Sequence, residues 1–426
     1  REIAMFNFSI QYFFKEIRKN IMMIGVVSSA LLLLSLILNM FYNTVLNPPL
    51  NTNDLAAFYV GLLRFTIIML FMLMCIYLVI YSINYYNKVH SRILGLLKIF
   101  GNTTYEIVIF FTLQIVIILL ISFLVFTLLN IVVTPLLFKL ISYYIKKTVT
   151  TILFGKAYLD TLAFFFLTIL VIIFVEFRYI IQTPTTHLIK GDEVISYRIK
   201  SKNLFKEILY FLLLCYGLFI IVTSKLELDL VVPLSLCVIG INGIIKFTIP
   251  RIVQTVILQK NISGELLVVL KNYIFIINQM GVLVFFSVLI NLVMPLMIYM
   301  YINKVGFFIE FVLMYIFTNL ILNYIIYQRL SIRRIDNKKS YNKLYTLGYD
   351  LKSIEKYVKK ENILFFLTLF IGIAVYFFTL SISLILKNAI PKMAILICLI
   401  YIIPMSVILI VTNYKERRSV LSWKKS

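Results

Sequence analysis

Long apolar runs separated by short polar segments dominate the chain. Ten of these runs come close to or exceed the roughly 20 residues that a helix needs to cross a bilayer. The pattern therefore predicts an all-α polytopic membrane protein with about ten transmembrane helices. The predicted spans are 21–43, 57–85, 106–133, 158–177, 206–224, 230–249, 273–300, 307–328, 362–386 and 393–413.

Composition supports this prediction. Hydrophobic residues make up 62% of the 426 positions and charged residues only 14%. A soluble protein that buried so much apolar surface would still need a polar exterior, which so few charged residues cannot supply. The four cysteines all fall inside predicted spans, where they are expected to act as small apolar residues. No spacing among cysteines and histidines is typical of a metal site, so no metal is predicted.

The chain is strongly basic, and its charge is unevenly placed. It has 41 lysines and arginines against 18 acidic residues. With both termini cytoplasmic, only nine of the basic residues fall on the outer side, and the opposite orientation inverts this ratio. The positive-inside rule therefore predicts cytoplasmic termini and a charge related to topology, not a nucleic-acid partner. Frequent Ile, Lys, Asn and Tyr are typical of an AT-rich bacterial genome, so we expect the bacterial cell membrane.

Two polar segments of the chain repeat each other. The segment "LLKIFGNTTYEI" (96–107) aligns with "KLYTLGYDLKSI" (343–354) at an offset of 247 residues. A shorter match, "RKNI" (18–21) with "LKNY" (270–273), has an offset of 252. Such offsets predict an internal duplication in which corresponding segments do the same work.

The duplication predicts three parts. Residues 1–178 form a first repeat of an amphipathic N-terminal helix and four spans. Residues 179–250 form a cytoplasmic linker and an inserted pair of spans. Residues 251–426 form a second four-span repeat and a basic C-terminal tail.

The repeated segments, here called the first elbow (residues 92–107) and the second elbow (residues 341–354), share a pattern. Apolar residues at helical spacing lead to a glycine, where a helix end favours a residue that tolerates positive φ. Thr103 and Glu106 then form a capping box, and Asp350 is the equivalent N-cap. We expect a short amphipathic helix that ends, a turn, and the start of the next membrane helix.

The elbows and their flanks resemble one family. The segments "YSINYYNKVHSRILGLLKIFGNTTYEI" (81–107) and "RRIDNKKSYNKLYTLGYDLKSIEKYVKKENILFF" (333–366) are similar to FtsX-like ABC transporter permeases. The similarity is greatest to the ten-span BceB-type subfamily, which is associated with bacitracin and lantibiotic resistance. It implies two FtsX-like four-helix repeats plus the inserted helix pair.

The chain departs from the family in two places. His90 and Ser91 stand where the family tends to have a basic and an acidic residue. Only "YINKVG" (301–306) connects spans seven and eight, where BceB-type proteins carry a large extracellular domain. The family's capture of substrate outside the cell therefore does not transfer to this chain.

The energy source is expected to lie in another subunit. The chain has no GxxxxGK[ST], HExxH or GxSxG motif, so we predict a non-enzymatic permease without catalytic residues or a cofactor of its own. The resemblance implies two copies of a cytoplasmic ABC ATPase, which hold the ATP and Mg, docked on the elbows of one permease. The expected ATPase-coupling residues are Leu94, Gly95, Leu97, Lys98, Phe100, Gly101, Thr103 and Glu106 in the first elbow and Tyr341, Leu344, Leu347, Gly348 and Asp350 in the second.

A few polar residues inside the spans are candidates for a substrate cavity. Arg64 and Glu310 lie near the outer ends of spans two and eight with opposite charges, so they are expected to pair or to line an outer cavity. Snorkelling to the interface is the alternative. Asn291 and Asn319 are candidates for the same cavity, although interhelical hydrogen bonds would explain them equally well.

The largest outer element is the segment 134–158. Lysines punctuate its aromatic and aliphatic residues, a pattern that favours a helix lying in the outer membrane interface. Such a helix would meet anionic lipid or a lipid-bound peptide, or serve only as an anchored connector.

The resemblance implies the removal or export of an amphipathic antimicrobial peptide or a similar lipophilic substrate. Two other classes stay open. The chain could be a flux-sensing membrane partner of a histidine kinase, as some relatives are. It could also be an ATP-independent lipid flippase or a membrane enzyme, which the lack of converging carboxylates or histidines in the spans disfavours. Membrane lipids are expected partners in every case.

Overall fold

The computed structural model describes residues 9, 11–46, 55–182, 204–223, 231–259, 264–300, 305–386 and 391–422. Within these ranges the chain is helical and forms no strand. They contain ten helical spans long and apolar enough to cross a membrane, which confirms the number predicted from the sequence. The chain is a multi-pass α-helical membrane protein.

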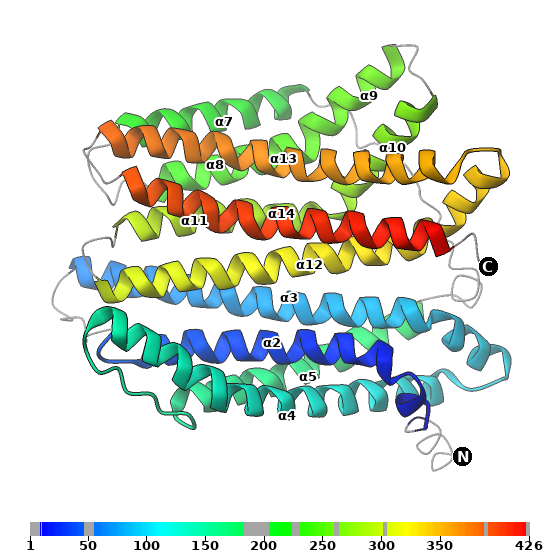
Figure 1. Ribbon diagram of the computed structural model, residues 1–426, viewed down its shortest axis with the longest axis horizontal. Helices are drawn as coiled ribbons and strands as arrows, with labels where there is room; N and C mark the ends of the chain where they lie inside the picture. Colours follow the sequence, from blue (N-terminus) through cyan, green and yellow to red (C-terminus); the bar gives the residue numbers. More distant parts are fainter. Residues whose placement is uncertain are drawn as a thin grey trace. The chain divides into compact units, whose positions relative to one another are not determined.

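Packing divides the chain into two compact units. The first unit comprises residues 1–194 and 304–310, and the second comprises residues 195–303 and 311–426. The helices of the predicted inserted pair belong to the second unit. Each unit is described by itself below, and Figure 1 gives the helix labels.

The first unit is a four-helix arrangement built around one central helix. Its helices are α2 (Ile17–Tyr42), α3 (Leu55–Ile99), α4 (Thr104–Ile145) and α5 (Lys156–Gln182). Helix α2 packs against each of the other three, and most of its apolar side chains are buried. Ser35 of α2 donates a hydrogen bond to Oδ1 of the buried Asn130 in α4, at 3.2 Å.

The second unit is organised around α13, which packs against α7, α10, α11 and α14. The Tyr376 hydroxyl of α13 donates to the carbonyl of Leu292 at 3.1 Å, and Ser383 donates to the carbonyl of Ile221 at 3.0 Å. The helices are α7 (Leu204–Thr223), α8 (Val231–Gly243), the π-helical η2 (Ile244–Thr248), α9 (Ile249–Gln259), α10 (Gly264–Gln279), α11 (Gly281–Met300), α12 (Val305–Thr346, which belongs to this unit from Phe311 onward), α13 (Leu351–Leu386) and α14 (Pro391–Ser422).

Helices α7 and α8 approach each other closely at small residues. A Cβ added at Gly217 would lie 2.7 Å from Sγ of Cys237, and one at Gly240 would lie 2.9 Å from the backbone nitrogen of Leu214. Small residues at such contacts let helices pack tightly in lipid, where dispersion forces drive association. The π-helical η2 follows α8 and precedes Pro250, whose missing amide and bulky ring disturb the α-helical hydrogen bonds upstream.

The elbows do not begin with a separate amphipathic helix, as the sequence pattern had indicated. Helix α3 runs without a break to Ile99, and α12 runs to Thr346. The 45 residues of α3 would extend about 68 Å, well beyond the roughly 30 Å of a hydrocarbon core. Because residues 85–94 and 332–346 contain neither glycine nor proline, nothing in them interrupts the helix.

The expected interfacial segment 134–158 is only partly helical. Helix α4 continues through Pro135 to Ile145, and Figure 1 shows its last turns inclined to the rest of the helix. Lys146 ends the helix with a positive φ of 58°. Non-helical residues then lead back to α5, where Tyr158 stacks on Phe126 with ring centroids 6.0 Å apart.

Candidate functional site

The first elbow turns at a glycine in a left-handed conformation. The amide of Asn102 donates to the carbonyl of Leu97 at 3.2 Å, and the amide of Gly101 donates to the carbonyl of Lys98 at 3.3 Å. Gly101 has a φ of +80°, which L-residues rarely adopt. These two bonds with the positive φ form a Schellman motif, which satisfies carbonyls at the helix end.

The second elbow repeats this turn bond for bond. The amide of Tyr349 donates to the carbonyl of Leu344 at 3.1 Å, and the amide of Gly348 donates to the carbonyl of Tyr345 at 3.0 Å. Gly348 has a φ of +91°. Each of these residues lies 247 positions after its counterpart in the first elbow.

The helix that follows each turn also begins alike. The side chain of Thr103 accepts from the amide of Glu106 at 3.3 Å, and Glu106 Oε2 accepts from the amide of Thr103 at 2.9 Å, which completes the predicted capping box. The carbonyls of Thr103 and Asp350 accept the first intrahelical bonds, from Ile107 and Ile354. Both isoleucines are fully buried. The two turns are therefore anchored by the same kind of side chain.

Each elbow exposes one large apolar residue directly before its glycine. Phe100 is 78% exposed and Leu347 is 75% exposed. These two residues also stand 247 positions apart, as the sequence alignment predicted. An exposed apolar side chain at a rigid turn is the kind of anchor that fits a groove on a partner.

The other predicted coupling residues lie deeper in the first elbow. Leu94 and Gly95 are buried, and Leu97 is partly buried. The Lys98 ammonium donates to the carbonyl of Ile180 in α5 at 3.0 Å, and its burial lowers the pKa of this lysine. The apolar stripe thus begins in the core of the first unit, and only its end reaches the surface.

In the second elbow, Leu344 and Tyr349 are partly buried against Ile354 and Val358. Asp350 is exposed. The side chain of Tyr341 lies outside the described residues. Leu347 is the most exposed of the large apolar residues that the structure describes in this elbow, ahead of Tyr345 at 54%.

A polar contact joins the two helices of each elbow near its base. In the first unit the buried Tyr86 hydroxyl donates to Oε1 of Gln114, which we call the first clamp. In the second unit Nη2 of Arg333 lies 2.6 Å from Oε2 of Glu361, which we call the second clamp. Both members of the second clamp lie 247 positions after those of the first. The offset was visible in the sequence, but the sequence analysis did not follow it to these residues.

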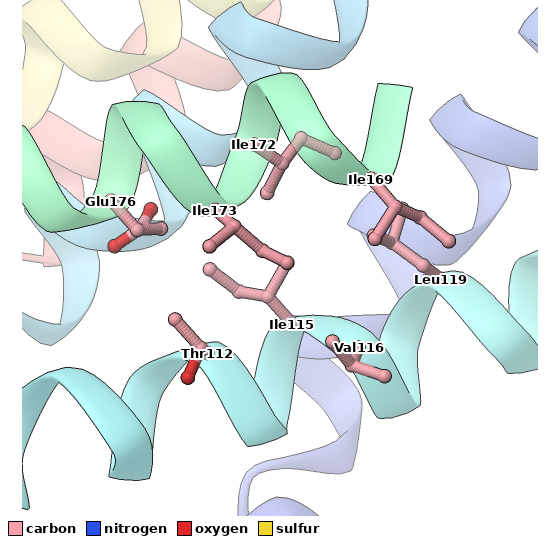
Figure 2. Close-up of a pocket in the computed structure, with 8 residues that line it drawn as sticks. All are labelled: Thr112, Ile115, Val116, Leu119, Ile169, Ile172, Ile173 and Glu176. Carbon is pink, nitrogen blue, oxygen red and sulfur yellow. The ribbon is translucent and has the colours of Figure 1, made fainter. Parts of the chain in front are cut away.

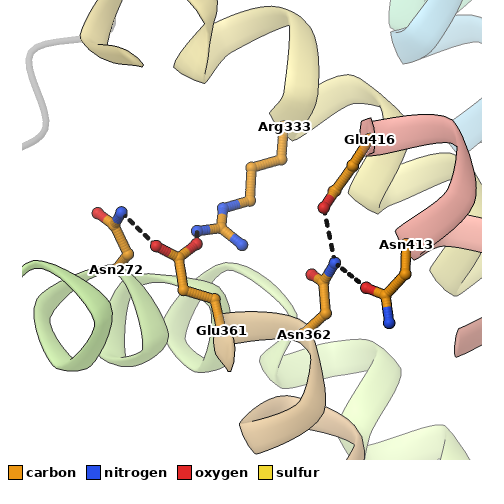
Figure 3. Close-up of polar contacts among 6 residues, drawn as sticks. All are labelled: Asn272, Arg333, Glu361, Asn362, Asn413 and Glu416. Carbon is orange, nitrogen blue, oxygen red and sulfur yellow. Dashed lines mark hydrogen bonds and ion pairs between the residues drawn. The ribbon is translucent and has the colours of Figure 1, made fainter. Parts of the chain in front are cut away.

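The second clamp belongs to a larger buried network, shown in Figure 3. Glu361 Oε1 also accepts a hydrogen bond from Asn272 of α10 at 2.7 Å. The neighbouring Asn362 donates to Glu416 at 2.8 Å and to Asn413 at 3.1 Å, both in α14. The charges and amides therefore tie α10, α12, α13 and α14 together at one level.

The clamps mark where the elbows leave the apolar part of the bundle. The apolar membrane-spanning stretch of α3 ends at Asn84, two residues before Tyr86. The corresponding stretch of α12 ends at Ser331, two residues before Arg333. The elbow glycine of each copy lies 15 residues beyond its clamp, which corresponds to about 22 Å of helix. The elbow tips therefore project past the membrane-spanning segment.

The N-terminal segment packs against α3 and α4 beside the first elbow. The hydroxyl of Tyr12 is 2.9 Å from Nδ1 of His90, and Ser9 donates to the carbonyl of Phe110 at 3.2 Å. Burial, together with the nearby charge of Glu16, raises the pKa of Tyr12 to about 12. His90 thus has a packing role at the base of the elbow.

The substrate-cavity candidates fall in both units. In the first unit Glu310 is buried, and the side chain of Arg64 lies outside the described residues. In the second unit the Tyr315 hydroxyl donates to Oδ1 of Asn291 at 2.8 Å, and Asn319 donates to the Tyr315 carbonyl at 3.0 Å. The hydrogen bond from Tyr315 to Asn291 links α12 to α11, which is the alternative that the sequence had left open.

The comparisons with known proteins do not assign the chain to a family. No protein-family model matches it, and no curated protein is significantly similar to it.

Proposed function

We propose that the chain is the membrane-spanning permease subunit of an FtsX-like ABC transporter. In this proposal a separate cytoplasmic ATPase dimer docks on the two elbows, one ATPase on each. The observation that carries it is the identity of the two turns. Both have the same Schellman bonds, a glycine with positive φ, and an exposed apolar residue, and their positions share one offset of 247 residues.

An internal duplication explains why the elbows match. The residues of the two clamps are separated by 247 positions, as the residues of the two turns are. Each clamp lies just past the end of a membrane-spanning stretch, and these two stretches also end 247 positions apart. We infer two four-span repeats, with α7 and the span from α8 to α9 as the inserted pair. Two docking points on one chain suit two identical ATPases, because identical partners need like surfaces.

The elbows are suited to transmit force. Hydrogen bonds at the turn and a buried isoleucine after it hold the angle between the two helices of each elbow. Movement of the tip therefore moves the base, where the clamp joins the spans. ATP and Mg bind to the partner subunit in this scheme, and the chain itself holds neither.

The excess of basic residues on the elbow side supports a cytoplasmic location for the elbows and for both termini. The proposed substrate is an amphipathic peptide or a similar lipophilic molecule, which the spans move or remove from the bacterial cell membrane.

The test is coupling to an ATPase through the elbow tips. We expect two ATPase copies to co-purify with each full-length chain and to hydrolyse ATP faster when an amphipathic peptide is added. Replacing Phe100 and Leu347 together by Ser should reduce both the bound ATPase and the stimulation at least about tenfold, because two central apolar anchors are lost.

The matched control is Tyr143→Ser. Tyr143 is 86% exposed at the other end of α4, so the change removes an exposed aromatic residue far from the elbow. It should leave ATPase binding as in the unmodified chain. If the double elbow variant binds and stimulates the ATPase normally, the proposed docking is wrong.

A further inference from the structure

One face of α4 is closed off by α5. Ile115 and Leu119 of α4 are buried where, together with Ile173 of α5, they line a narrow apolar contact between the two helices, shown in Figure 2. Glu176 lies at the elbow end of this contact and accepts a hydrogen bond from Asn87 of α3 at 2.5 Å. Lipid therefore meets α4 on another face.

That other face carries a row of exposed aliphatic side chains. Its members recur every four residues, a spacing that puts them on one side of a helix, and each is between 60% and 66% exposed. Residues 115–138 contain no charged side chain. In a multi-pass membrane protein such a row lies against acyl chains. The row consists of Leu124, Leu128, Val132 and Leu136.

The row changes character at Lys139. Lys139 and then Tyr143 continue it toward the end of α4, and both are exposed, Tyr143 to 86%. Lys146 ends the helix three residues later, and the exposed Lys147 follows it. A change from leucine to lysine and tyrosine is typical of the passage from the hydrocarbon layer to the lipid headgroups.

Two measures of depth agree with this passage. Gln114 of the first clamp lies at the elbow-side edge of the membrane-spanning part. Lys139 lies 25 residues farther along α4, which is about 38 Å of helix against a hydrocarbon core of roughly 30 Å. Asn43, directly after the membrane-spanning stretch of α2, donates to the carbonyl of Thr150 at 2.9 Å. Residues 139–150 therefore lie at the headgroup level of the leaflet opposite the elbows.

This segment, residues 139–150, is here called the far anchor, and its chain is held in place. Pro135 lacks the amide that would bond to the carbonyl one turn before it, so the last turns of α4 bend away, as Figure 1 shows. The amide of Val149 donates to the hydroxyl oxygen of Ser142 at 3.0 Å. The chain after Lys147 therefore folds back onto the end of α4, and its lysines stay beside the helix.

The positive charges of the far anchor have no acidic counterpart nearby in the sequence. Residues 107–159 contain no aspartate or glutamate. The first acidic residue after them, Asp160, accepts a hydrogen bond from the Tyr42 hydroxyl at 2.5 Å. Lys139, Lys146 and Lys147 form no ion pair among the residues that the structure describes. Three ammonium groups at headgroup level thus face the lipid phosphates.

We propose that the far anchor binds anionic phospholipids in preference to zwitterionic ones. The ammonium groups of Lys139, Lys146 and Lys147 pair with phosphate oxygens, and the ring of Tyr143 lies among the headgroups. A zwitterionic headgroup carries its own cation next to the phosphate, whereas an anionic headgroup takes its cation from the protein. This commits the segment to one of the occupants that the sequence pattern left open, and it does not rest on the proposed transport function.

The experiment measures which lipid touches the far anchor. In the full-length chain Trp423, the single tryptophan, is replaced by Phe, and Tyr143→Trp supplies a new fluorophore. The chain is reconstituted in phosphatidylcholine that contains either brominated phosphatidylglycerol or brominated phosphatidylcholine, with the bromines near the headgroup end of the same acyl chains. Bromine quenches only a tryptophan that it contacts. We expect the association constant of phosphatidylglycerol to exceed that of phosphatidylcholine at least about fivefold, the factor that one lysine near an anionic surface supplies.

Two sets of lysine variants separate charge from packing. Replacing Lys139, Lys146 and Lys147 together by Gln should abolish the preference, while quenching by brominated phosphatidylcholine persists and shows that the chain is still inserted. Replacing the same three residues by Arg keeps the charge and should keep the preference.

The control for depth is Leu124→Trp in the same background. Leu124 is 63% exposed and lies ten residues after Gln114, near the middle of the hydrocarbon layer. Its fluorescence should be quenched equally by the two lipids, because the lysines lie about 22 Å away along the helix.

The proposal is overturned if both lipids quench Tyr143→Trp equally, or if the Gln variant keeps the preference. It is also overturned if neither lipid quenches Tyr143→Trp while both quench Leu124→Trp. That result would put the far anchor in water, where a soluble peptide and not a lipid would meet its lysines.

Discussion

At the scale of single residues, the two elbow glycines are determined by backbone conformation and not by crowding. A Cβ added to Gly101 or to Gly348 would meet nothing within 4 Å. Replacing either glycine by a residue with a side chain therefore lowers the folding stability only through the positive φ, which disfavours L-residues by roughly 1–2 kcal/mol. This makes the glycines clean probes of the turn.

We predict that Gly101→Ala and Gly348→Ala each lower the free energy of unfolding by about 1 kcal/mol. Denaturant unfolding in mixed micelles, followed by circular dichroism, measures this change. The control is Gly25→Ala inside α2, where a Cβ also meets nothing within 4 Å but the backbone is helical. That variant should be neutral or more stable, because alanine is the better helix former. Equal effects at all three positions would contradict the importance of positive φ.

Exposure separates residues that a sequence pattern treats alike. Leu94, Leu97 and Phe100 have helical spacing and form one stripe, yet Leu94 is fully buried and Phe100 is exposed. The N-terminal segment contacts α3 at His90, and α5 contacts it at Lys98, whereas Phe100 lies at the end of the stripe, next to the turn. We therefore expect the coupling function to depend on Phe100 far more than on Leu94, whose replacement would affect folding.

At the scale of helices, the two clamps join equivalent pairs of helices by different interactions. The first uses a neutral hydrogen bond between Tyr86 and Gln114, and the second uses a buried ion pair between Arg333 and Glu361. Both join the helices of an elbow at its base. A buried ion pair is sensitive to the loss of one partner, because the other charge stays behind without compensation.

We predict that Arg333→Tyr alone destabilises the chain by about 3–5 kcal/mol, because the buried carboxylate of Glu361 loses the guanidinium that it contacts at 2.6 Å. Adding Glu361→Gln installs the residues of the first clamp in the second unit and should restore most of the loss. The full double-mutant cycle, measured by denaturant unfolding, gives the coupling energy. If the double variant is no more stable than the single one, the clamps are not equivalent.

At the scale of the whole molecule, the length of α4 predicts that its two ends lie on opposite sides of the membrane. Its 42 residues run from the first elbow to a turn at Lys146, and a helix of this length can reach both faces of a bilayer. The residues at its two ends should therefore be accessible from opposite sides.

We predict that Phe100→Cys reacts with a membrane-impermeant thiol reagent only from the cytoplasmic side and Tyr143→Cys only from the outside. The background is a chain whose native cysteines are replaced by alanine. Leu124→Cys, which is exposed on α4 between these positions, should react from neither side because lipid covers it. Reaction of Phe100→Cys and Tyr143→Cys from the same side would contradict the transmembrane path of α4.

Sequence reasoning located much of the candidate site because its signals are local. A glycine after an apolar stripe, followed by a capping box, predicts a turn from neighbouring residues alone, and the structure contains both turns. The clamp residues also carried a signal, since Tyr86 and Gln114 align with Arg333 and Glu361 at the offset already found. Glu176 was visible as a carboxyl group near the end of an apolar run, but its significance depends on which residues surround it.

The sequence by itself determined the number of spans and the positions of the turns. Both follow from hydrophobic length and from local backbone preference, which need no knowledge of distant contacts. Only the tertiary structure decided that α3 and α12 extend unbroken into the elbows, that Phe100 is exposed while Leu94 is buried, and that Glu176 of α5 accepts a hydrogen bond from Asn87 of α3. These features depend on which helices pack together, and packing joins residues far apart in the chain through contacts that no local pattern encodes.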